Sequence, residues 1–136
     1  MKTVTDKIIK NMFKEAKRVM KYSNIKQKRW IFGAAVLGNS GKIYGGTNFD
    51  GCPMDYCSER VALLKALSEG EKIVALLTTY DGKFENEKDL GGMCGVCLNA
   101  FYQLGGRNLK LPIYSWPTQE KNFRMTTLGK LYPEPF

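Results

Sequence analysis

Four cysteines in a chain without a single histidine constrain its fold more than any other feature of the sequence. Without histidine the chain cannot build a Ser-His-Asp or Cys-His nucleophile, a histidine general base, or a zinc site that needs imidazole. Three of the cysteines, Cys57, Cys94 and Cys97, lie where two helices are expected to begin. If these thiols act together, the fold must bring two helix starts to one place. Chemistry near neutral pH is left to thiolates, carboxylates, lysines or a metal ion.

Cys94 and Cys97 form a Cys-x-x-Cys motif, which places two thiols one helical turn apart at the start of a helix. The positive end of the helix dipole favours their thiolate form. The motif alone does not distinguish a zinc site from a redox pair or a chance occurrence. Cys57, 37 positions upstream, adds a third thiol. Three thiolates would leave a tetrahedral zinc with one open position, as catalytic zinc sites have. Glu59, two residues past Cys57, could then carry protons for a water molecule.

Cys52 is the fourth cysteine, and it is not spaced as half of a second Cys-x-x-Cys pair. We therefore interpret it as a bystander. The alternative is a closed structural zinc site made by all four cysteines. That alternative predicts bound zinc without turnover.

Hydrophobic periodicity and turn residues predict that strands alternate with helices along one domain, residues 1–136. Helices are expected over residues 5–21, 57–68 and 95–104, and strands over 30–37, 42–48, 72–79 and 109–115. The C-terminal end is expected to be irregular because it contains Pro117, Pro133 and Pro135. This alternation is typical of an α/β layered fold whose later strands are parallel.

The net charge of +8 resides entirely in residues 1–30, which hold ten basic and two acidic side chains. We interpret this segment as the solvated face of a helix, since apolar residues recur at helical spacing between the lysines. The alternative is a surface that binds nucleic acid or an anionic membrane. Binding that weakens steeply with salt would distinguish the two.

The apolar stretches at residues 30–37 and 74–77 are far shorter than the roughly 20 residues that span a bilayer. The N-terminus also lacks the apolar run of a signal peptide. We therefore expect a cytoplasmic protein with no membrane partner. Thiols stay reduced in that compartment, which favours a metal or catalytic role for the cysteines over disulfides.

These motifs resemble the zinc-dependent cytidine deaminases, whose signature is Cys or His, any residue and Glu, followed later by Pro-Cys-x-x-Cys. The resemblance extends along most of the chain. Residues 32–36 resemble the family's Val-Gly-Ala-Ala strand, 40–44 its hairpin turn, 57–60 and 68–70 its Cys-Ala-Glu-Arg helix and exit, and 127–136 its ending. The resemblance implies a three-layer fold with a mixed five-stranded sheet flanked by helices.

The resemblance also implies roles for the residues around the cysteines. Zn²⁺ would be held by Cys57, Cys94 and Cys97, and Glu59 would be the catalytic acid and base. Arg60 resembles the family arginine that donates hydrogen bonds to the ligand thiolates. Zinc with three thiolates carries a formal charge of −1, so an arginine and the helix dipoles would offset the excess negative charge. The alternative role for Arg60 is a surface salt bridge.

Substrate contacts are implied for Trp30, Asn48, Asp50, Ser58 and Phe136. Asn48 and Asp50 stand where the family has Asn-x-Glu against the ribose, with Asp50 one methylene shorter. The alternative for both is turn chemistry. Trp30 replaces a phenylalanine that stacks on the pyrimidine, or else it fills the core. Phe136 resembles a residue that closes the site of a neighbouring subunit, which implies a homotetramer.

The function implied by the resemblance is hydrolytic deamination of cytidine or 2′-deoxycytidine to the uridine product and ammonia, a step of pyrimidine salvage. Glu59 would deliver protons to the ring and to the departing amine. The substrate would be a free nucleoside, and nucleic acid is not an expected partner. The seven positions from Asp50 to Cys57 are about two fewer than in typical nucleoside deaminases and closer to blasticidin S deaminase. A deaminase of another cytosine nucleoside or amino-heterocycle is therefore the alternative.

Overall fold

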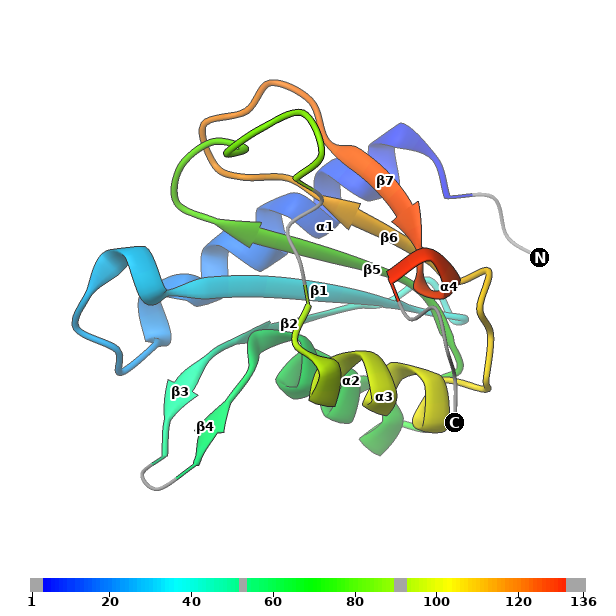
Figure 1. The fold of residues 1–136 in the computed structure, drawn as a ribbon. Coiled ribbons are helices and arrows are strands. Elements are labelled where there is room, and N and C mark those ends of the chain that lie inside the picture. The colour runs from blue at the N-terminus through cyan, green and yellow to red at the C-terminus, as the bar shows by residue number, and fades with distance from the viewer. Residues whose placement is uncertain (1–3, 52–53, 90–92, 132–136) are drawn as a thin grey trace.

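A mixed five-stranded sheet forms the middle of three layers in the computed structural model, which describes residues 4–51, 54–89 and 93–131 (Figure 1). Its strands, in spatial order, are β2 (Ile43–Thr47), β1 (Phe32–Gly38), β5 (Ile73–Tyr80), β6 (Pro112–Ser115) and β7 (Arg124–Thr127). β1 is antiparallel to both β2 and β5, β5 is parallel to β6, and β6 is antiparallel to β7. The expected α/β fold with a mixed five-stranded sheet is confirmed.

Helix α1 (Asp6–Val19) covers one face of the sheet (Figure 1). The helix starts where the Thr5 side chain accepts a hydrogen bond from the Ile8 amide at 3.3 Å, a standard N-cap. The buried residues of α1 recur at helical spacing: Ile9, Met12, Phe13, Ala16 and Val19. The first four pack in one core with residues of β1 and β5. The lysines of the helix lie on its exposed side, as amphipathic spacing predicts. A 3₁₀ turn, Met20–Tyr22, follows the helix.

Helices α2 (Ser58–Ser68) and α3 (Gly95–Leu104) cover the opposite face. Successive residues of a strand point to opposite faces, so Ala34 and Val36 pack towards these helices while Ala35 and Leu37 pack towards α1. Ala62, Leu63 and Phe101 complete the core on the α2 and α3 side. The sheet therefore separates two hydrophobic cores and carries both helix starts of interest on one side.

Gly46 on β2 lets α2 lie unusually close to the sheet. A Cβ atom at this position would lie 2.5 Å from the Ala62 nitrogen and 2.7 Å from the Ser58 carbonyl oxygen. Both atoms belong to helix backbone, which cannot turn aside as a side chain can. This contact sets the height of the first turn of α2 above the sheet, and with it the position of the residues that begin the helix.

Three parts of the chain differ from the sequence expectation. β3 (Phe49–Asp50) and β4 (Asp55–Tyr56) form a small antiparallel hairpin that projects beside the sheet (Figure 1). The C-terminal segment, expected to be irregular, contains the edge strand β7 and the short helix α4 (Leu128–Leu131). Trp30 lies in a 3₁₀ turn, Lys28–Trp30, and not in the strand. Each of these elements is two to four residues long, which is too short for hydrophobic periodicity to indicate it. They form because a neighbouring strand offers an edge to pair with, or because the chain turns locally.

None of the helices in the described part of the chain has the length and apolar character needed to cross a bilayer.

Candidate active site and metal centre

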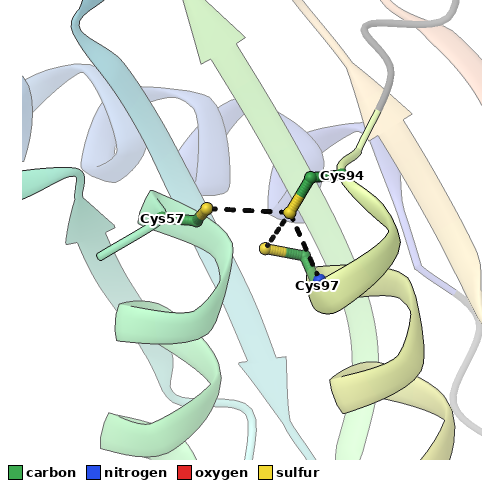
Figure 2. A group of neighbouring side chains, drawn as sticks. All are labelled: Cys57, Cys94 and Cys97. Carbon is green, nitrogen blue, oxygen red and sulfur yellow. Dashed lines mark hydrogen bonds between the residues drawn. The ribbon is translucent and has the colours of Figure 1, made fainter. Parts of the chain in front are cut away.

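Three cysteine side chains meet where helices α2 and α3 begin (Figure 2). Cys57 is the N-cap of α2, Cys94 is the N-cap of α3, and Cys97 lies in the first turn of α3. The Sγ atoms of Cys57 and Cys94 are 3.8 Å apart, and those of Cys94 and Cys97 are 3.4 Å apart. All three sulfurs lie within 4.8 Å of one another, and all three are free thiols. The structure therefore brings the two helix starts together, and the cluster could hold a metal ion.

The surroundings of the cluster shift the pKa values of Cys94 and Cys97 in opposite directions. The backbone N–H of Cys97 points at the Sγ of Cys94 from 3.4 Å. Burial raises the pKa of Cys94, but this hydrogen bond and the contacts with the other two thiols outweigh it, so the pKa lies below its ordinary value. Cys97 is fully buried, and burial together with the Glu59 charge raises its pKa.

Arg60, in the first turn of α2, supplies positive charge to the cluster. Its Nη2 atom lies 3.5 Å from the Sγ of Cys57 and donates to the carbonyl oxygen of Asp55 at 3.3 Å. The hydrogen bond to Cys57 is the main reason that the pKa of Arg60 is raised. The guanidinium therefore contacts a sulfur of the cluster and a backbone carbonyl.

Glu59 places a carboxyl group against the same cluster. Its Oε2 atom lies 3.9 Å from the Sγ of Cys97, and the residue is half-buried. Burial raises the pKa of this carboxyl group, because the charged form loses contact with water. A carboxyl group with a raised pKa beside a cluster that could hold a metal ion is suited to proton transfer near neutral pH.

An open cavity of about 650 Å³ adjoins the cluster. Cys57, Cys94 and Glu59 line it, whereas Cys97 and Arg60 are not among its lining residues. The cavity also collects the substrate contacts expected from the sequence: Trp30, Asn48, Asp50 and Ser58. Phe136 and Cys52, two further residues considered from the sequence, lie outside the described residues.

Hydrogen bonds hold the side chains of two of these cavity residues, Asn48 and Trp30. The Asn48 carboxamide accepts a hydrogen bond from the Phe32 amide at 2.9 Å and donates to the Trp30 carbonyl oxygen at 2.6 Å. The Trp30 side chain is 53% exposed, so the alternative that it fills the core is wrong. Its indole N–H donates to the Gln27 side chain at 2.9 Å, which fixes the ring at the cavity wall.

Sequence reasoning missed several residues that line the cavity: Asn24, Tyr56, Thr78, Thr79 and Tyr80. The last three lie at the carboxyl end of β5, next to the parallel strand β6. Ligand crevices of α/β sheets open at this end of parallel strands, so the end of the expected strand was a usable signal. Asn24 had no such signal, because it lies in a loop.

Comparison with known proteins identifies the family of this chain. No family model matches it. A cytidine deaminase from Halalkalibacterium halodurans is 30% identical over 128 residues, which cover 92% of this chain and 91% of that protein. The chain belongs to the cytidine deaminase family. A second cytidine deaminase, from Sporosarcina psychrophila, is 26% identical over 133 residues, covering 94% of this chain and 90% of that protein.

The fold of this cytidine deaminase family member agrees with solved structures. The crystal structure of cytidine deaminase from Burkholderia pseudomallei has a TM-score of 0.78 at 24% identity, covering 93% of this chain and 98% of that chain. A dCMP deaminase from the cyanophage S-TIM5 shares the fold more distantly, with a TM-score of 0.54 at 22% identity over 85% of this chain and 87% of that chain. The family resemblance expected from the cysteine and glutamate motifs is confirmed.

Proposed function

We propose that the protein is a zinc-dependent hydrolase that deaminates cytidine or 2′-deoxycytidine to the uridine product and ammonia. The observation that carries this proposal is the convergence of Cys57, Cys94 and Cys97 beside Glu59, at one cavity, in a member of the cytidine deaminase family. The relatives from H. halodurans and S. psychrophila both bear the name cytidine deaminase.

The donor set fits zinc. A tetrahedral zinc ion with Zn–S bonds of about 2.3 Å separates two sulfur ligands by about 3.8 Å. The observed spacings are 3.8 Å for Cys57 to Cys94 and 3.4 Å for Cys94 to Cys97. Three thiolates are ligands that zinc prefers, so Cys57, Cys94 and Cys97 would hold the ion. Bound there, zinc would supply Lewis acidity that makes water a nucleophile near neutral pH.

Glu59 is the proton carrier in this proposal. Its carboxylate accepts a proton from the attacking water, and the water oxygen forms a bond with C4 of the cytosine ring. Glu59 delivers this proton to ring N3. It then accepts the second proton of the same oxygen and delivers it to the amino group, so that the carbonyl forms at C4 while the C4–N bond breaks and ammonia leaves. The raised pKa of the carboxyl group suits a residue that must both accept and donate a proton.

Arg60 and the helix starts offset the charge of the three thiolates. The Arg60 guanidinium contacts Cys57, and the Cys97 amide at the start of α3 contacts Cys94. Both interactions withdraw electron density from sulfur. They act in the direction that a site with three anionic ligands and no imidazole requires.

The substrate is proposed to be a free nucleoside. The exposed indole of Trp30 at the cavity wall offers a surface for stacking on the pyrimidine. Asn48 and Asp50 line the part of the cavity proposed to hold the sugar, and Ser58 lies at the start of α2 beside Glu59. These assignments follow the family pattern that the sequence resembles.

A cytoplasmic homotetramer acting in pyrimidine salvage is the proposed setting. Large apolar side chains are exposed on the outer surfaces of α2 and α3, namely Leu64, Val96 and Leu104. Contacts between subunits would bury such side chains. Phe136 would close the site of a neighbouring subunit. Light scattering on the purified protein measures the assembly directly.

The decisive experiment replaces the proton carrier. Glu59→Ala should lower the rate of ammonia release from cytidine by a factor of 10² or more while zinc stays near one ion per chain, because Glu59 is not a ligand. Glu69→Ala is the matched control, since it removes a carboxylate from the other end of the same helix. Undiminished ammonia release by the Glu59→Ala protein would remove the proposed mechanism.

A further inference from the structure

The cavity wall that carries Asn48 and Asp50 is tied to a loop about 25 positions earlier in the chain. The Ser23 hydroxyl donates to the Asn48 carbonyl oxygen at 2.7 Å. Asn24 contacts Asp50 twice: its Nδ2 donates to the Asp50 carbonyl oxygen at 2.9 Å, and its Oδ1 accepts from the Asp50 amide at 2.8 Å. One carboxamide therefore holds both backbone polar groups of Asp50.

The geometry of the hairpin explains why Asp50 needs this partner. Gly51 donates to the Met54 carbonyl oxygen, so the position next to it, Asp50, turns its N–H and C=O away from β4. Asn24 approaches this outer edge and makes the pair of hydrogen bonds that a further strand would make. β3 is thus held on one edge by β4 and at Asp50 on the other edge by the Asn24 side chain.

The tie between the two segments is reciprocal. Asn48 holds the backbone of Trp30 and Phe32, and Gln27 holds the Trp30 indole. Asn24, Gln27, Trp30, Asn48 and Asp50 all line the same cavity. The loop that carries the proposed ring-stacking residue and the hairpin that carries the proposed sugar contacts are therefore one hydrogen-bonded unit.

We propose that Asn24 is a positioning residue for sugar recognition, an inference that rests on the function proposed above. Its two hydrogen bonds fix the peptide groups on both sides of the Asp50 Cα atom, and so set the direction in which the carboxylate extends. Asp50 has a short side chain, so its reach depends on where the backbone holds it. Asn24 and Asp50 are both exposed, and their backbone groups can bind water when the carboxamide is removed. Loss of Asn24 therefore affects position much more than folding.

The test pairs a variant with a substrate that lacks one hydroxyl group. The ribose 3′-hydroxyl is the group that Asp50 is proposed to contact. Asn24→Ala should therefore lower kcat/KM for cytidine about tenfold, mostly through KM, as expected for loss of one or two hydrogen bonds. It should change kcat/KM for 3′-deoxycytidine, which lacks that hydroxyl group, by less than about twofold. Asn39→Ala is the matched control, because Asn39 is also an exposed asparagine whose Oδ1 accepts from a distant amide, that of Lys72 at 2.9 Å. This control should leave both substrates unaffected.

Amide hydrogen exchange gives a readout that does not depend on turnover. The Asp50 amide should exchange faster in Asn24→Ala than in the wild type, while amides of β5 keep their protection. Equal losses of kcat/KM on both substrates, or an unchanged Asp50 exchange rate, would overturn the positioning role. A wild-type protein that releases no ammonia from either nucleoside would instead overturn the proposed function itself.

Discussion

Replacing Gly46 with alanine tests how the sheet positions the site. A Cβ atom there would lie 2.5 Å from the Ala62 nitrogen, whereas ordinary van der Waals contact begins at 3.4 Å. Because the obstructing atoms are helix backbone, α2 must move outward by roughly 0.9 Å. Cys57 and Glu59 move with α2, while Cys94 and Cys97 stay with α3.

The expected cost has two parts. Overpacking of this kind costs about 1–3 kcal/mol of unfolding free energy, which lowers the Tm by roughly 3–12 °C in a chain of this size. A shift near 1 Å between reacting groups costs about 10²-fold in rate. The Gly46→Ala protein should therefore combine a modest loss of Tm with a large loss of kcat/KM for cytidine and weaker retention of zinc.

Gly95 offers a matched control beside the same cluster. A Cβ atom at Gly95 would meet nothing within 4 Å, and the residue begins α3 next to Cys94. Gly95→Ala should leave activity unchanged and raise the Tm slightly, because alanine favours helix. Calorimetry, zinc content and steady-state kinetics on both variants decide the matter. A Gly46→Ala protein with wild-type Tm, zinc content and kcat/KM would refute the argument that close packing sets the site.

Two further predictions concern charged groups. Arg60→Gln should speed the release of zinc to a chromogenic chelator, because the Cys57 thiolate loses its 3.5 Å contact with the guanidinium; release at the wild-type rate would contradict this role. Glu71→Gln tests a carboxylate that accepts hydrogen bonds from Ser40 and Tyr44, which hold its pKa below the ordinary value of 4.5. Because the pKa of Glu71 is lower in the folded state than in the unfolded chain, the ionised carboxylate stabilises the fold above pH 4.5. This stabilisation is lost as the pH falls through the pKa of Glu71 in the folded protein. The stability difference between wild type and Glu71→Gln, from urea titrations, should therefore be full at pH 7 and shrink below pH 4.5, and a difference independent of pH would count against it.

Local patterns in the sequence predicted most of the regular structure, for physical reasons that act over short distances. The apolar spacing of α1 and the cysteines that cap α2 and α3 are signals contained within one or two turns of helix. Residues 124–127 have no such signal: β7 exists because β6 offers it an edge to pair with. The hairpin of β3 and β4 likewise depends on two strands of two residues each, too short for periodicity to show.

The residues of the site also differ in whether the sequence could predict them. Cys57, Cys94, Cys97 and Glu59 could be singled out because their residue types and spacing carry the chemistry of a metal centre. Asn24 could not, because an asparagine in a loop gives no sign of the strand edge it will contact. Its role depends on a partner, Asp50, that lies 26 positions away.

The sequence by itself determined which side chains are available to bind a metal. It also determined that two helices begin at cysteines, because helix starts are encoded by nearby residues. It also determined that chemistry must proceed without histidine. Only the tertiary structure decided that the three sulfurs lie within 4.8 Å and that loop and hairpin share one cavity wall. Those distances depend on how closely helices pack on the sheet, and that is set by contacts between residues far apart in the chain, such as Gly46 against Ala62.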